Sequence, residues 1–283
     1  MRFDKQHFRK RKNGDSVILT AAALLLAFAC LTLVYYYSDA NSEYSDQGDI
    51  VMSGSAETTA DTAESGGADS GETTFGPETD DHQNAIDYPS FADYNGEPYA
   101  ILNGNRPRFT DDELTTVSYE KYEDLDDLGR AGVCEACVGR DIMPTEPRGR
   151  LGSVKPSGWQ TVKYDIVAGR YLYNRCHLIG YQLTGENSNV NNLITGTRYM
   201  NTQGMLPFEN MVADYVKETG NHVMYRVTPV FEGDDLLAGG VCIEAYSVED
   251  GGAGICFNVF CYNVQPGIVI DYSNGDNWLE DVP

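Results

Sequence analysis

The sequence predicts an α+β domain over residues 91–283, with a mostly antiparallel sheet and a helix packed on it. Two observations carry this prediction. Three segments near the C-terminus are strand candidates, and glycine-containing turns separate them. Before them, residues 199–218 place apolar side chains at positions 208, 211, 212, 215 and 216, which is helical spacing. Strands and a helix grouped in this way indicate the α+β class.

The elements expected before the helix are short. Residues 98–105 predict a strand that ends in an Asn-Gly turn, and the acidic segment 111–128 predicts a short helix. Residues 161–167 and 170–180 predict the two strands of a hairpin, joined by an Ala-Gly turn. These elements supply the first part of the sheet.

The helix and the strands after it have clearer limits. The Gly-to-Pro break at residues 204–207 predicts the true start of the helix. Residues 223–232, 239–249 and 254–264 predict three further strands. Because the turns between them are short, these strands are expected to be antiparallel neighbours.

Three segments of different composition precede the domain. Residues 1–16 hold six basic and two acidic side chains, and residues 17–37 hold no charged side chain. An apolar run of this length predicts a transmembrane anchor, whose basic flank places the N-terminus in the cytoplasm. A cleaved signal peptide is the alternative. Residues 38–90, with 13 acids and no Lys or Arg, predict a disordered acidic linker. The expected location is therefore the cell membrane, in a single pass with the C-terminal domain outside, or secretion after cleavage.

The charge is strongly negative overall but uneven along the chain. The formal net charge is −23, from 43 acidic and 20 basic side chains, which argues against a protein that coats nucleic acid through bulk positive charge. The window 140–175 differs, because it holds seven basic and three acidic side chains. Such a window can steer a polyanion to one place on an acidic body, or it can be a solvated basic loop.

Six cysteines follow the apolar run, and two of them, Cys134 and Cys137, form a single C-x-x-C. An even number would permit three disulfides in an oxidising setting. One C-x-x-C supplies half of the four ligands of a structural zinc site, and its glycine-rich surroundings do not suggest the helix of a redox motif. We interpret these cysteines as structural residues or disulfide partners. A metal-sulfur or redox module is the alternative.

One stretch carries residues suited to phosphodiester chemistry. A single histidine, His177, lies at the end of an expected strand, and Asn192, Asn201 and Glu209 follow it on the way into the helix. A neutral imidazole takes a proton from water near pH 7. Amide oxygens and waters suit a hard cation such as Mg²⁺, which neutralises a phosphate. Arginine holds phosphate oxygens through paired hydrogen bonds.

The residues 173–212 (YNRCHLIGYQLTGENSNVNNLITGTRYMNTQGMLPFENMV) resemble the DNA/RNA non-specific endonucleases of the ββα-metal (His-Me finger) type. The resemblance is to the secreted and DNA-entry nucleases of Gram-positive bacteria in particular, and it extends over about residues 95–275. It includes residues 103–105, 143–159 and 224–231. It implies the ββα-metal fold, DNA and RNA as substrates, no obligate protein partner, and Mg²⁺ as cofactor, with Mn²⁺ as a substitute.

The resemblance also implies a role for five residues of this sequence. His177 takes the place of the general base, and Arg175 takes the place of the arginine in the same motif. Asn192 corresponds to the asparagine that helps to hold the site. Asn201 corresponds to the asparagine that binds the metal, and Glu209 to the helical glutamate that orders metal-bound water.

Two positions depart from the family pattern, and three others are expected to bind substrate. Asn174 stands where the family has Asp, and Cys176 stands where it has Gly. Since neither position is the base or the metal ligand, activity is expected to survive both changes. Arg148, Arg150 and Lys155 precede the motif in the basic window and are expected to bind substrate phosphates.

Taken together, these features predict a metal-dependent, sequence-non-specific endonuclease outside the cell. Its membrane contact would be residues 17–37. A catalytically silent surface domain for DNA binding or uptake is the alternative from another class, but it would not need His177 and its three partners together. We interpret His222, the other histidine of the domain, as a packed or surface residue.

Overall fold

The computed structural model describes residues 88–89, 93–149, 151 and 154–281. The predicted basic tail (1–16), membrane segment (17–37) and all but the last few positions of the acidic linker (38–90) lie outside the described residues. Within the described part of the chain, none of the helices has the length and apolar character needed to cross a bilayer.

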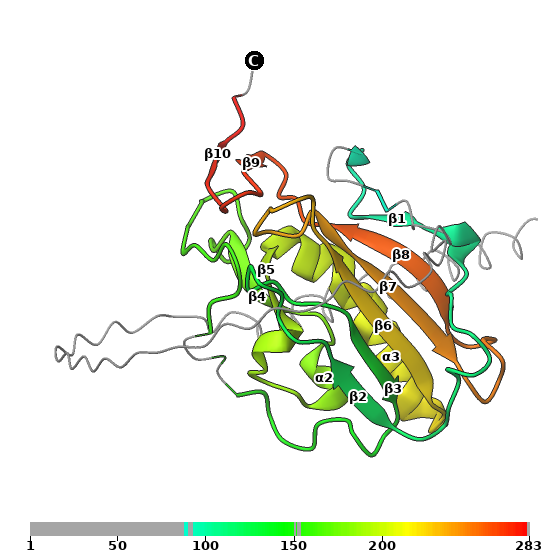
Figure 1. Ribbon diagram of the computed structural model, residues 1–283. Helices are drawn as coiled ribbons and strands as arrows, with labels where there is room; N and C mark the ends of the chain where they lie inside the picture. The colour runs from blue at the N-terminus through cyan, green and yellow to red at the C-terminus, as the bar shows by residue number, and fades with distance from the viewer. Residues whose placement is uncertain (1–87, 90–92, 150, 152–153, 282–283) are drawn as a thin grey trace, which may run out of the picture. The chain divides into compact units, whose positions relative to one another are not determined.

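The domain is of the α+β class, as predicted, and its main sheet has six antiparallel strands in the order β1-β8-β7-β6-β3-β2 (Figure 1). Its strands are β1 (Tyr99–Ile101), β2 (Tyr119–Tyr122), β3 (Cys134–Val138), β6 (Val223–Val230), β7 (Gly240–Ser247) and β8 (Cys256–Tyr262). Two small antiparallel sheets complete the strands: β4 (Tyr173–His177) with β5 (Leu193–Thr197), and β9 (Ile268–Ile270) with β10 (Asn277–Leu279).

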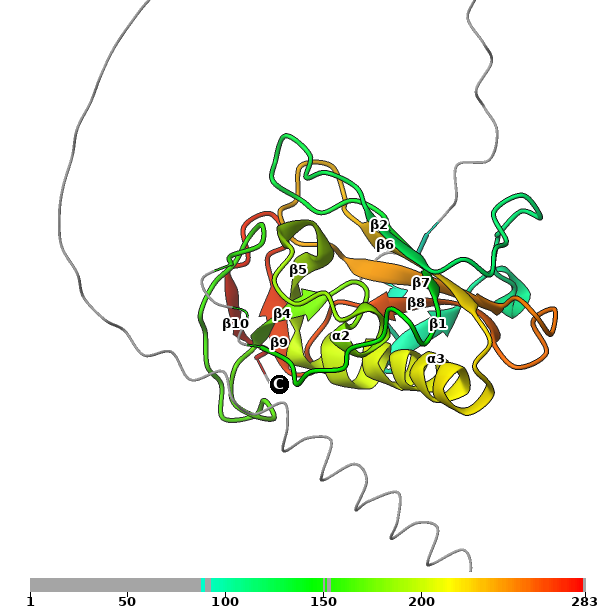
Figure 2. The same cartoon turned by 90° about the horizontal axis from the view of Figure 1, so that it is seen from below.

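One face of the main sheet is covered by the helix α3 (Leu206–Thr219), as Figure 2 shows. The shorter helical segments are η2 (Asn103–Asn105), α2 (Tyr181–Thr184), η3 (Val190–Asn192) and the π-helical η4 (Met200–Met205), which leads directly into α3. Figure 2 also shows β4 and β5 at one end of the main sheet, next to β9 and β10. The chain therefore reaches α3 by way of β4 and β5.

The core lies between α3 and the main sheet, on the face that alternate residues of the central strands share. Alternate side chains of β6, β7 and β8 point toward α3, and their neighbours point to the other face. The residues that form this core from the three strands are Val223, Tyr225, Val227, Val241, Ile243, Ala245, Phe257, Val259 and Cys261. The helix contributes Val212, Ala213 and Val216 from a single stripe, which explains the helical spacing seen in the sequence.

The opposite face of the sheet is polar and centred on Arg226. Its guanidinium forms ion pairs with Glu113, with Glu135 at 2.7 Å and with Glu244 at 3.4 Å. Glu244 also accepts a hydrogen bond of 2.9 Å from the buried Asn258. These groups satisfy one another where the loop before β2 covers the sheet, so this face serves the fold.

The three long strands and the helix were predicted correctly, and two earlier predictions were wrong. Residues 111–128 contain the strand β2 and no helix, because β2 pairs along its whole length with β3. Residues 161–167 form turns and do not pair with 170–180 beyond one isolated bridge, Lys163 to Tyr171. The true partner of β4 is β5, so the segment with His177 pairs forward in the chain.

All six cysteines of the described domain are free thiols, so of the two interpretations given above the structure favours structural residues over disulfide partners. Five of them are buried, and Cys256 is exposed. Cys134 and Cys137 donate to the main-chain oxygens of Asn191 and Thr115, at 3.4 and 3.1 Å. The role of Cys134 and Cys137 is therefore structural.

Candidate active site

His177 is the last residue of β4, and its ring is held at both nitrogens. It pairs with Leu193 of β5, and its side chain is 6% exposed. Its Nε2 lies 2.8 Å from the main-chain oxygen of Asn187, and its Nδ1 lies 3.1 Å from Nη2 of Arg148. A guanidinium only donates hydrogen bonds, so Nδ1 accepts here and Nε2 carries the hydrogen. The contacts thus select the tautomer with a lone pair on Nδ1.

The same surroundings keep this imidazole neutral. Burial, and then the positive charge of Arg148, lower the pKa of His177 to about 4. At neutral pH the ring is therefore unprotonated, which is the state that a general base needs. Substrate must still reach Nδ1, on the side where Arg148 lies.

Asn192 fixes the chain directly after His177. Its side chain is fully buried, accepts a hydrogen bond from the main-chain nitrogen of Ile179 at 2.8 Å and donates one to the main-chain oxygen of Ile179 at 2.9 Å. The main-chain oxygen of Asn192 also accepts from Leu178 at 2.9 Å. This residue therefore acts on the backbone that carries the histidine.

Asn201 lies in the π-helical turn η4, where the amide of Leu206 bonds to its main-chain oxygen five residues back. Single π-turns in helices are frequent at functional sites. The side chain is half-buried, and its Oδ1 accepts the S–H of Cys176 at 2.9 Å. An amide oxygen has two lone pairs, so one remains available for another partner.

Glu209, in the first turn of α3, is buried beside Gly180. A Cβ at Gly180 would lie 2.5 Å from Oε2 of Glu209, so only glycine allows this approach. Burial raises the pKa of Glu209 to about 7, against the opposing effects of Gln182 and Arg148. The negative charge of Glu209 and the positive charge of Arg148 both act on the Cys176 thiol, which places them in one neighbourhood.

A divalent cation fits the chemistry of these donors. Asn201 offers a neutral oxygen, and Glu209 offers a carboxylate whose ionised form a nearby cation would stabilise. Among the described residues, no group of three or more His, Cys, Asp or Glu is arranged to hold a metal ion. A cation here would therefore keep several of its waters, as Mg²⁺ commonly does.

The remaining predicted residues occupy different positions. Arg175 donates to the main-chain oxygen of Val154, and its guanidinium lies 4.2 Å from the ring centre of Trp159. It therefore braces the segment that follows the basic loop. Lys155 is exposed on that segment, and Arg150 lies outside the described residues.

Four partners of the site were not predicted from the sequence. Gly180 and Gln182 surround Glu209, and Asn187 binds His177 through its backbone, which no side-chain pattern reveals. The bond from Cys176 to Asn201 was also missed. Gly180, which follows the motif directly, was the one available signal in the sequence, because a glycine allows another group to approach the backbone closely.

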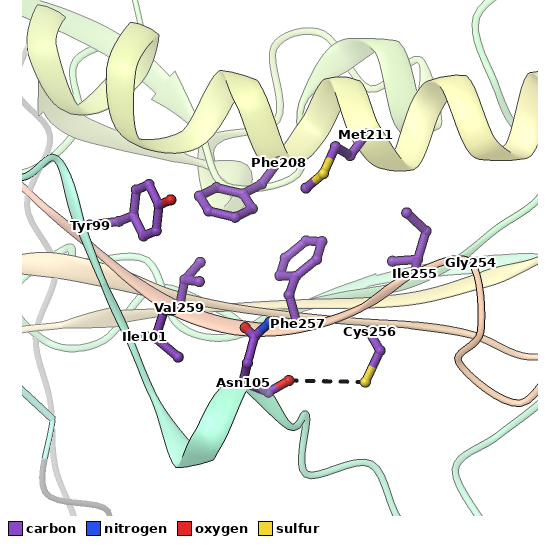
Figure 3. A pocket seen from close by; sticks show the side chains of 10 residues that line it. All are labelled: Tyr99, Ile101, Asn105, Phe208, Met211, Gly254, Ile255, Cys256, Phe257 and Val259. Atoms are coloured by element: carbon purple, nitrogen blue, oxygen red, sulfur yellow. Dashed lines mark hydrogen bonds between the residues drawn. The ribbon is translucent and has the colours of Figure 1, made fainter.

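An apolar pocket lies elsewhere on the domain and contains none of the predicted site residues (Figure 3). Its walls come from β1, from β8 and from the side of α3 that faces these strands, through Tyr99, Ile101, Phe208, Met211 and Phe257 (Figure 3). The cavity has a volume of about 270 Å³ and no titratable carboxylate or histidine in its lining. The chemistry is therefore concentrated around β4, η4 and the start of α3.

Comparison with known proteins gives one family and two informative structures. Residues 111–249 match the sequence model of the family described as DNA/RNA non-specific endonuclease. NucA from Streptococcus agalactiae, solved with a magnesium ion bound, is 26% identical with a TM-score of 0.56, and the match covers 64% of this chain and 86% of that chain. The Sda1 nuclease, solved with a bound zinc ion, is 27% identical with a TM-score of 0.51, over 66% of this chain and 97% of that one.

Proposed function

Residues 111–249 form a domain of the DNA/RNA non-specific endonuclease family, and on that premise we propose that this chain is a metal-dependent, sequence-non-specific endonuclease that acts outside the cell. DNA is the proposed substrate, together with RNA. The observation that carries the proposal is His177, a buried and neutral imidazole with its lone pair on Nδ1. The order β4, β5, η4–α3 around it corresponds to the strand–strand–helix unit of a ββα-metal site.

The proposed reaction is hydrolysis with His177 as general base. Nδ1 takes a proton from a water molecule, and the water oxygen forms a bond to phosphorus as the bond from phosphorus to the 3′ oxygen breaks. The products are a 5′-phosphate and a 3′-hydroxyl. The main-chain oxygen of Asn187, 2.8 Å from Nε2, stabilises the imidazolium that forms. Asn192 keeps the ring in place by fixing the backbone at Ile179.

Arg148 is proposed to move between the base and the substrate. Its Nη2 lies 3.1 Å from Nδ1 of His177, where a water would have to be activated. A phosphate oxygen is a stronger acceptor for a guanidinium than a neutral imidazole is. An arriving phosphate would therefore draw Arg148 away and uncover Nδ1. Lys155 and Arg150 would add sequence-independent contacts to the backbone.

Asn201 is the residue proposed to hold the cation, with waters in its other positions, and Glu209 is the residue proposed to order those waters. When bound, a divalent cation supplies positive charge that stabilises the transition state and the departing oxygen. Mg²⁺ is the proposed cofactor, and Mn²⁺ is expected to replace it, since both prefer oxygen ligands. The magnesium ion in NucA and the zinc ion in Sda1 support a divalent cation in general. Residues 17–37 are proposed to anchor the chain or to be removed on secretion.

A plasmid-cleavage assay tests the proposal. The full-length chain is expected to degrade supercoiled plasmid in Mg²⁺ buffer, to stop in EDTA and to recover when Mg²⁺ is returned. His177→Ala and Asn201→Ala should each lower the rate by roughly 10²- to 10⁴-fold. His222→Ala, which removes the other histidine of the domain, is the matched control and should stay within about twofold of the parent rate.

Two results would contradict the proposal. If His177→Ala cleaved plasmid at the parent rate, His177 would not be the general base. Binding of plasmid without any cleavage, by a folded parent chain supplied with Mg²⁺ or Mn²⁺, would instead indicate a silent DNA-binding domain.

A further inference from the structure

The inference concerns Cys176, which stands in the site but has no role in the proposed reaction. Its side chain is fully buried, whereas the neighbouring Asn201 is half-buried. The thiol therefore approaches Asn201 from the interior of the domain, and the more exposed side of the amide stays available. The Sγ-to-Oδ1 distance is 2.9 Å.

The space for this thiol is built into the neighbouring strand and helix. A Cβ at Gly196 of β5 would lie 2.7 Å from Sγ and 2.8 Å from Cβ of Cys176, so the glycine makes room for the cysteine. On another side, Sγ lies 3.9 Å from Sδ of Met205 at the end of η4. The thiol is thus confined between β5 and η4, and of the two acceptors in reach of its S–H the oxygen of Asn201 is the nearer and the stronger.

This confinement determines which end of the amide is presented. The two ends of an asparagine side chain are nearly equal in shape, but only the oxygen binds a cation, while the NH₂ group donates hydrogen bonds. An S–H donor at 2.9 Å favours the rotamer with Oδ1 beside it and disfavours the flipped one. The second lone pair of that oxygen is then directed by the protein before any cation arrives.

We propose that Cys176 is a positioning residue for the metal site, which holds the side-chain oxygen of Asn201 in the orientation that receives a divalent cation. The inference rests on the proposed function, since it takes Asn201 as the metal ligand. It assigns a purpose to the cysteine at a position where the resemblance expects glycine. The thiol acts as a hydrogen-bond donor and does not itself bind the cation.

Titration of the full-length chain with Mn²⁺, followed by the loss of the free-ion EPR signal, tests this role without measuring activity. Cys176→Ala removes the donor and should raise the Kd for Mn²⁺ about tenfold, as expected for a residue that orients a ligand. Cys176→Ser restores a donor at the same place and should stay within about threefold of the parent. Cys137→Ala is the matched control, since Cys137 is equally buried and also donates to one oxygen, at 3.1 Å, on the remote strand β3.

The outcomes separate this inference from the proposed function. If Cys176→Ala binds Mn²⁺ as tightly as the parent, or more tightly, while Asn201→Ala loses binding, the metal site stands and the positioning role is wrong. If Asn201→Ala also binds normally, the assignment of the metal ligand fails and the inference falls with it. Unfolding temperatures in EDTA identify any variant that fails to fold, and where Cys176→Ala does so, Cys176→Val removes the donor with less change in volume and gives the same comparison.

Discussion

The two histidines of the described domain, His177 and His222, have opposite surroundings. His177 lies at the end of β4, is 6% exposed, and has an arginine at Nδ1 and a carbonyl at Nε2. His222 lies just before β6, is only partly buried, and has its Nδ1 2.6 Å from Oε1 of Glu249. The main-chain nitrogen of His222 also donates to the same carboxylate, at 2.8 Å.

The difference shows that the partner decides what a histidine does. A neighbouring arginine cannot accept a proton and repels the imidazolium, so His177 is kept as a neutral acceptor. A neighbouring carboxylate accepts hydrogen bonds, so both the ring and the main-chain nitrogen of His222 are bound to Glu249. The first arrangement suits proton transfer, and the second suits the connection of β6 to β7.

The largest expected effect comes from the residue that fixes the backbone of the His177 region. Asn192→Ala removes both side-chain bonds to Ile179 and leaves a buried N–H and C=O of Ile179 without these partners. We expect the free energy of unfolding to fall by about 2–4 kcal/mol, and cleavage to fall even where the protein is folded. Urea unfolding measures the first effect.

The neighbouring asparagine supplies the control for that change. Asn191 is half-buried, and its side chain reaches Asp124 at 3.5 Å. Asn191→Ala should change the free energy of unfolding by less than about 0.5 kcal/mol. If both variants lowered the free energy of unfolding equally, the two bonds from Asn192 to Ile179 would not be what stabilises the His177 region.

The next effect is a pH dependence of stability that comes from His177. The pKa of His177 is about 4 in the folded protein and 6.5 for an unperturbed histidine. Between these values the unfolded chain binds a proton that the folded chain does not, so stability falls as the pH is lowered. His177→Gln has no such proton to bind, so it should lose less stability in acid. When the pH is lowered from 7.5 to 4.5, its free energy of unfolding should rise by about 2–3 kcal/mol relative to that of the parent.

Urea unfolding in EDTA at the two pH values measures this gain, with His222→Gln as the comparison. That variant removes a favourable ion pair and should show no gain in acid. If the free energy of unfolding of both variants changes with pH in the same direction and by the same amount, the arginine partner of His177 is not the cause of its pH dependence.

The fold was predictable where a local pattern reports burial. The strands β6 to β8 are long apolar segments separated by glycine-containing turns, and α3 carries one apolar stripe, so both were found. The strand β3 was missed because it has only five residues, and its Cys-Glu-Ala-Cys segment was considered only for metal, redox or disulfide chemistry. The pairing of β4 with β5 was missed because the hairpin is closed by α2, η3 and their loops, and the preceding segment 161–167 offered a nearer partner.

The family pattern could name the candidate residues of the site, but it could not give their contacts. The family pattern supplied His177, Asn192, Asn201 and Glu209, and the structure places all four between β4 and the start of α3. The contact of Arg148 with His177 joins residues 29 positions apart across an irregular loop, which no periodicity reports. Its effect on the imidazole follows only from the tertiary structure, as does the bond from Cys176 to Asn201.

The smallest expected effect concerns the ion pair at His222, and it tests whether this region is independent of the site. Burial favours a raised pKa at Glu249, but the hydrogen bonds from His222 outweigh it and lower the pKa below its usual range. The stability from this carboxylate is therefore present above pH 4.5 and is lost as the pH falls through the lowered pKa.

Because the pair is partly exposed, Glu249→Gln should lower the free energy of unfolding by less than about 1 kcal/mol at pH 7 and by almost nothing in acid. Urea unfolding at both pH values, with the exposed Glu218→Gln as control, measures this. A cost of several kcal/mol, or a loss of plasmid cleavage, would mean that the end of β7 is coupled to His177 and that the two regions do not act separately.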